Sequence, residues 1–173
     1  MHRLMTYCFA IAIGLGAGTA FAQTTGNTAS KADEAFIKEA VQGDLAEVDM
    51  GKLAQEKAQS PAVKDFGKML EQDHGEHLQK ARSKAQELGV NAPDAPSAKQ
   101  KAMHDELSKL SGTQFDEQFA QAMVADHKED IRGYEKQAKS KGPLADFAQQ
   151  TLPTLQKHLQ TAEAVSRQKH SRR

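Results

Sequence analysis

The sequence predicts an all-α fold, a four-helix bundle with a short extra helix in the crossover between the second and third long helices. The composition indicates helices, because Trp is absent, aromatic residues make up only 5% of the chain, and Ala, Gln, Lys, Glu and Leu are abundant. Apolar residues also recur every three or four positions along four long segments, which is the spacing of one helix face. The same composition disfavours a turn-rich all-β fold.

Length and charge limit the size of the protein and its partners. The 173 residues suffice for one domain. The chain has 23 basic and 23 acidic residues, so its formal net charge is zero. Nucleic-acid-binding proteins usually have an excess of Lys and Arg that binds the phosphate groups. This chain has no such excess, so we expect no nucleic-acid partner. The single Cys excludes an intramolecular disulfide.

Residues 1–22 have the pattern of a secretory signal peptide. A short positive start precedes an apolar run over residues 8–17, and Ala20-Phe21-Ala22 supplies a small-x-small cleavage pattern. The run is too short to span a bilayer, and an uncleaved anchor is the competing interpretation. We expect an exported protein, periplasmic or associated with the outer membrane, whose mature chain has no transmembrane segment.

Start signals define the first two long helices. After a flexible lead-in over residues 23–30, Ser30 and Asp33 predict an N-cap with an acid in the first turn. Ser60 followed by Pro61 predicts a second cap with Pro at the first helical position. The first helix is expected to run to about Gln59, directly before the second start signal. The connection is therefore very short, and we expect the two helices to be antiparallel neighbours.

Breakers divide the rest of the chain. Gly89 is placed to end the second helix, and Gly142-Pro143 separates the last two helices. The remaining elements are a stiff linker, a short helix and two long helices, over residues 91–96, 97–110, 113–140 and 144–167. Pro153 is expected to kink or divide the last helix. The bundle domain therefore covers residues 31–167 and precedes a basic tail over residues 168–173.

Four ionisable residues lie within the predicted apolar stripes, one on each long helix: Glu47, His74, His127 and His158. Glu47 and His74 lie 13 and 14 residues from Ser60, which places both about 20 Å from the same turn. His127 lies about 20 Å and His158 about 25 Å from the turn near residue 141. All four therefore reach roughly one level of the bundle.

Ionisable groups at these positions need partners, because burying them unpaired costs several kcal/mol. Three imidazoles and a carboxylate are a plausible site for one transition-metal ion, Zn, Cu or Fe. His77 and Asp130 are candidates to hydrogen-bond the outer nitrogens of the ligand imidazoles. Two alternatives stay open: a metal-free hydrogen-bonded network, and histidines at the solvent-facing edge of the bundle. His104 and His170 are expected at the surface.

The chain resembles the uncharacterised bacterial family known as domain of unknown function 4142, which is placed among ferritin-like folds. The residues that carry the resemblance are Glu47-Val48, Gly51-Lys52-Leu53-Ala54, Asp73-His74, Phe115-Asp116, His127 and the segment 152–159. The resemblance covers about residues 36–165 and implies a ferritin-like bundle, without an agreed activity.

A ferritin-like di-iron site needs Glu on two helices and Glu-x-x-His on the other two. Glu71-x-x-His74 matches one such pair, but the last helix has Leu155 where the second Glu would stand. A mononuclear or His-rich site therefore fits this sequence better than a di-iron site.

Two functions remain open at the level of sequence. The first is an exported metal-binding protein for metal handling or stress response. The second is a non-enzymatic envelope or stress-associated bundle with a metal-free polar core, which contacts an envelope protein or a second copy of itself. No Ser or Cys nucleophile motif and no phosphate-binding glycine loop is apparent, so the sequence predicts no particular reaction.

Overall fold

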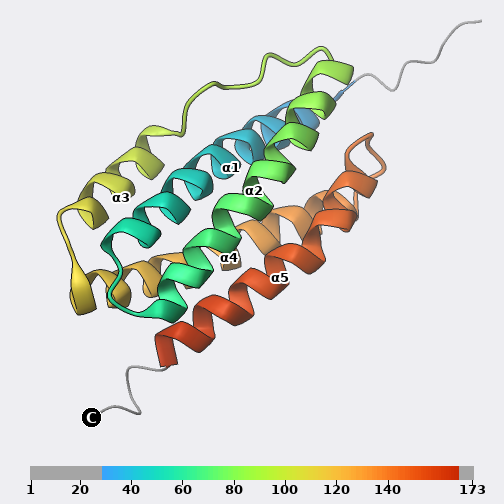
Figure 1. Ribbon diagram of the computed structural model, residues 1–173. Helices are drawn as coiled ribbons and strands as arrows, with labels where there is room; N and C mark the ends of the chain where they lie inside the picture. The colour runs from blue at the N-terminus through green and yellow to red at the C-terminus, as the bar shows by residue number, and fades with distance from the viewer. Residues whose placement is uncertain (1–28, 168–173) are drawn as a thin grey trace, which may run out of the picture.

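The computed structural model describes residues 29–167 and contains five helices in this part of the chain. Their bounds are α1 Lys31–Lys57, α2 Pro61–Glu87, α3 Ala98–Ser108, α4 Gly112–Ala138 and α5 Ala145–Arg167. The four long helices form a bundle, and the short α3 lies in the crossover between α2 and α4 (Figure 1). The all-α prediction is confirmed, while the predicted signal peptide, most of the lead-in and the basic tail lie outside the described residues.

Local capping explains two of the helix starts. Ser30 and Asp33 form a reciprocal capping box at α1, where each side chain accepts a hydrogen bond from the other residue's backbone N–H. Ser97 and Gln100 do the same at α3. In each pair the two residues are three positions apart, so the complete capping signal is contained in a short stretch of sequence.

The start of α2 differs from the prediction that Ser60 caps its own helix. The Ser60 side chain makes no capping hydrogen bond. Instead, the Asp116 carboxylate from α4 accepts the backbone N–H groups of Gln59 at 3.0 Å and Ser60 at 2.8 Å. This contact also joins the start of α4 to the turn between α1 and α2.

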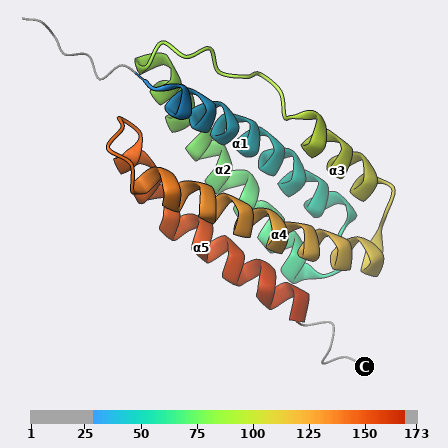
Figure 2. The same ribbon diagram turned by 180° about the vertical axis from the view of Figure 1, so that it is seen from behind.

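Contacts at both ends define the topology. The turn after α1 meets the start of α4, while Asp33 near the start of α1 accepts a hydrogen bond from Gln137 near the end of α4. Thus α1 and α4 are antiparallel. Each also packs mainly against its own hairpin partner, α1 against α2 and α4 against α5. The crossover with α3 returns the chain along the bundle, as seen from behind in Figure 2.

The α1–α2 pair is held unusually close by two glycines. A Cβ atom added to Gly51 would lie 2.5 Å from the Gly67 carbonyl oxygen and 2.7 Å from the Glu71 backbone nitrogen. Both are backbone atoms, so a larger residue at Gly51 would force the two helices apart. These small residues let the α1 backbone approach α2 in the half of the bundle nearest their connecting turn.

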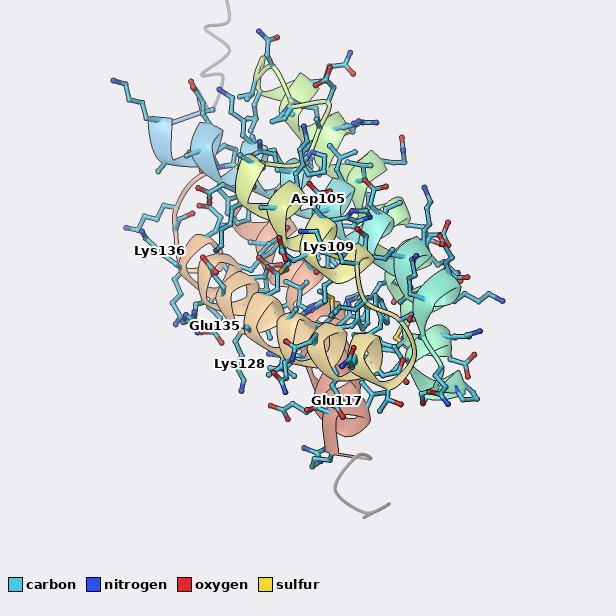
Figure 3. All side chains as sticks on the ribbon, turned by 90° about the vertical axis from the view of Figure 1, so that its left-hand side faces the viewer. Asp105, Lys109, Glu117, Lys128, Glu135 and Lys136 are labelled. Carbon is cyan, nitrogen blue, oxygen red and sulfur yellow. The ribbon has the colours of Figure 1, made fainter. Side chains whose placement is uncertain are left out.

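Two apolar clusters fill the bundle and leave a polar layer between them. One cluster contains Phe36, Leu78 and Leu144, and the other contains Met50, Phe66 and Phe119. Outward-facing sides of α3 and α4 are charged, as Figure 3 shows for Asp105 on α3, for Lys109 directly after α3, and for Lys128, Glu135 and Lys136 on α4. Among the described helices, none has a stretch both long and apolar enough to cross a membrane.

The last helix is not divided at Pro153, because α5 continues from Ala145 to Arg167. Proline removes the donor for the carbonyl four residues earlier, here that of Gln149. Both residues lie on the exposed side of α5, where water can replace the missing donor. Of the two expected effects of Pro153, division of the helix was therefore wrong, while a kink stays a prediction.

Candidate metal centre

The polar layer of the bundle contains the four residues selected from the sequence. Glu47 on α1, His74 on α2, His127 on α4 and His158 on α5 are all buried, with 1%, 5%, 0% and 0% of their surface exposed. None of them lies at the solvent-facing edge. Helical periodicity placed each of them correctly inside.

The three imidazoles form one cluster. The ring centroids of His74 and His158 are 5.1 Å apart, those of His127 and His158 are 5.3 Å apart, and those of His74 and His127 are 5.8 Å apart. One ring nitrogen from each lies within 4.8 Å of the other two. Such a group could hold a metal ion.

Each imidazole has one nitrogen held by the protein. His74 Nδ1 donates to Asp44 Oδ1 at 2.9 Å, and His158 Nε2 donates to Asp73 Oδ2 at 2.9 Å. His127 Nδ1 donates to the Met123 carbonyl at 3.0 Å. An acceptor of this kind holds the proton on the outer nitrogen and orients the ring.

The other nitrogen of each ring has no partner. His74 Nε2, His127 Nε2 and His158 Nδ1 are buried without a hydrogen bond, and so is Glu47 Oε2. An unpaired buried polar atom costs about 1–3 kcal/mol, so four in one layer are a substantial destabilisation. Because the acceptors fix the proton on the outer nitrogen, each of the three unpaired imidazole nitrogens carries a free lone pair.

His127 and His158 have lowered pKa values and stay neutral near physiological pH, which keeps their inner lone pairs available. Burial lowers the pKa of His127 to about 3, helped by the neighbouring His74 and His158. Burial, followed by the charge of His74, lowers the pKa of His158 to about 4, although Asp73 opposes this shift. Metal ions bind the neutral form of imidazole.

Glu47 belongs to a second group that shares His127. Ligand atoms of Glu47, Asp126 and His127 lie within 4.8 Å of one another. Burial raises the pKa of Glu47 well above its ordinary value, and the nearby charge of Asp126 raises it further. The four predicted residues therefore form two overlapping groups rather than one set of mutually close ligands.

His77 and Asp130 have different places from those expected. His77 reaches the cluster indirectly, because its Nδ1 lies 2.8 Å from the second oxygen of Asp44 while its Nε2 lies 2.9 Å from Thr151 Oγ1. Asp130 lines a cavity beside the cluster, and burial together with neighbouring carboxylates raises its pKa to about 8. The direct partners of the imidazoles include Asp44 and Asp73, which sequence reasoning missed.

A signal for these two partners was present in the sequence. Asp73 directly precedes His74 in a segment that carries the family resemblance, and Asp44 lies one helical turn before Glu47. Neither position reveals by itself which imidazole the carboxylate meets.

A cavity of about 840 Å³ opens between the helices and reaches His74 and His158. Its lining includes Glu39 and Glu129, which are exposed, so the cavity connects the polar layer to the surface. Carboxylates outnumber lysines along its walls. The cluster is thus buried but lies next to an acidic opening.

Comparisons with known proteins agree with this fold. No curated protein matches the sequence. A crystal structure of a DUF305 fragment from Deinococcus radiodurans is similar, with a TM-score of 0.71 and 17% sequence identity over 80% of this chain and 97% of that one. The family model described as "Domain of unknown function (DUF4142)" matches residues 18–165. The chain therefore belongs to the DUF4142 family.

Proposed function

We propose that this bundle binds one transition-metal ion through His74, His127 and His158, for metal handling or stress response. The observation that carries the proposal is the set of three buried imidazoles, each held by one nitrogen and unpaired at the other. A metal ion would satisfy all three unpaired nitrogens at once. A metal-free network would leave them at a cost of about 1–3 kcal/mol each.

The donor set suits Zn²⁺, Cu²⁺ or Fe²⁺, which accept neutral imidazole together with carboxylate. Asp44 and Asp73 would orient two of the ligands and increase their basicity. Glu47 groups with Asp126 and His127 but not with His74 and His158, so it is not among the ligands of this three-histidine position.

Metal content is the direct test. The protein, purified without an affinity His tag, would be analysed by mass spectrometry beside His74→Ala, His158→Ala and the control His104→Ala on α3. We expect near-stoichiometric metal that both core variants lose and the control retains. A folded, metal-free protein that also fails to bind added Zn, Cu or Fe would contradict the proposal and favour a structural polar core.

We further propose that the protein is exported to the periplasm or the outer membrane. The signal-like pattern of residues 1–22 supports this proposal. Expression with that segment, followed by intact-mass measurement of the periplasmic fraction, should give a chain that begins at residue 23. Full-length protein confined to the cytoplasm would refute it.

A further inference from the structure

The second group, formed by Glu47, Asp126 and His127, differs in chemistry from the three-histidine group. Two of its members are carboxylates, and one atom from each of the three lies within 4.8 Å of the others. Glu47 is 1% exposed, and its Oε2 has no hydrogen-bond partner. Two carboxyl groups and one imidazole give the oxygen-rich donor set that a divalent cation accepts.

The second group also lies beside the cavity that leads from the surface to the three-histidine group. Asp126 lines the cavity that reaches His74 and His158, whereas Glu47 lies behind it in the core. Around Asp126 the cavity wall carries Glu39, Glu129 and Asp130. Carboxylates outnumber lysines on this wall, and a concave surface with an excess of one sign of charge concentrates counter-ions and speeds their entry.

His127 connects the two groups through one nitrogen. Its Nδ1 donates to the Met123 carbonyl within the same helix, so Nε2 is the nitrogen left for an ion. A single lone pair coordinates one ion at a time. The two groups therefore offer alternative positions to one ion, rather than a pair of sites filled together.

We propose that Glu47, Asp126 and His127 form an oxygen-rich entry position, from which a divalent transition-metal ion passes to the three-histidine position. The inference rests on the proposed function and adds its route of loading. In the transfer, the ion exchanges carboxylate oxygens for the nitrogens of His74 and His158, while His127 remains a ligand. Imidazole-rich sets hold such ions more tightly than carboxylates do, so the direction is inward.

Loading kinetics with Co²⁺, whose visible spectrum reports its ligands, test this route. Asp126→Asn removes one carboxylate charge at a half-buried position with little change in shape. We expect it to slow Co²⁺ uptake about tenfold while leaving the final spectrum and the stoichiometry of one ion unchanged. Glu135→Gln makes the same charge change on the outer face of α4 and should load like the unmodified protein.

A second variant tests the position itself. His158→Ala, which should not retain metal through purification, should still bind added Co²⁺ weakly, with the faint absorption of an oxygen-rich site of higher coordination number. Adding Asp126→Asn to His158→Ala should abolish that residual binding. Residual binding that is indifferent to Asp126 would overturn the inference.

The outcomes separate this inference from the proposed function. If the unmodified protein binds no Co²⁺, the metal-binding function fails and the entry position fails with it. If one ion binds and depends on His74, but Asp126→Asn loads as fast as Glu135→Gln, only the entry position is refuted. If two ions bind at the same time, the inference that both positions share His127 Nε2 is wrong.

Discussion

Replacing His127 by leucine should stabilise the metal-free protein, and the gain should grow as the pH falls. His127 is fully buried, and its Nε2 has no partner, which costs about 1–3 kcal/mol. The substitution also removes the Nδ1 hydrogen bond to Met123, worth about 1 kcal/mol. That carbonyl keeps its helical N–H partner, so the net expected gain is about 1 kcal/mol near neutral pH.

The dependence on pH follows from the lowered pKa of His127, about 3 in the fold against the ordinary value of 6.5 for a histidine side chain. Between these values the unfolded chain binds a proton that the folded chain does not, so the native protein loses stability as pH falls. Each pH unit below 6.5 is worth about 1.4 kcal/mol, so at about pH 5 the difference is about 2 kcal/mol. The leucine variant lacks this loss, and its advantage should rise to about 3 kcal/mol.

Urea unfolding of the metal-free protein with a chelator, near neutral pH and at about pH 5, measures this difference. Titrating groups distant from His127 are common to both proteins and cancel in the comparison. His104→Leu controls for loss of an imidazole from the unfolded chain, because His104 is partly exposed on α3. A destabilisation by His127→Leu that is equal at both pH values would show that the imidazole is well satisfied in the apo fold, and would refute the reasoning.

Three further predictions concern other parts of the bundle. Gly51→Ala places a Cβ against the backbone at Gly67 and should cost at least about 1–3 kcal/mol in urea unfolding. Gly133→Ala, which meets nothing within 4 Å, should instead gain up to about 1 kcal/mol from helix propensity; equal effects would contradict the close helix contact. Asp116→Ala removes the acceptor for two backbone N–H groups at α2 and should lower the free energy of unfolding by about 1–2 kcal/mol, and an unchanged denaturation midpoint would argue against this cap. Glu47 has a raised pKa, so the fold holds a proton that the unfolded chain releases above its ordinary pKa, and stability falls as pH rises. Glu47→Gln should reduce the decrease in the free energy of unfolding by up to about 1.4 kcal/mol per pH unit. If the free energy of unfolding depends on pH in the same way in both proteins, Glu47 is ionised in the fold.

Helix positions were predictable because their signals are local. The capping pairs at Ser30 and Ser97 each lie within four consecutive residues, and the structure contains both. The cap of α2 was not predictable in this way, because its acceptor, Asp116, is 56 residues from Ser60 in the chain. A contact of that range depends on how two helices pack, which periodicity does not specify.

The burial of Glu47, His74, His127 and His158 was also contained in the sequence, since helical spacing determines which face a residue occupies. Their partners were not. Asp44 is buried and Asp73 and Asp126 are partly exposed, and in each case the packing of the neighbouring helix decides which group the carboxylate meets.

The sequence by itself therefore determined the helices, their inward faces and the donor residues of the candidate centre. Tertiary structure alone decided which nitrogen of each imidazole is free, that His127 belongs to two groups, and that an acidic cavity reaches the polar layer. The physical reason is that a helix face repeats with the local backbone geometry. Hydrogen-bond partners and cavities depend instead on the rotation and spacing of helices that are distant in the chain.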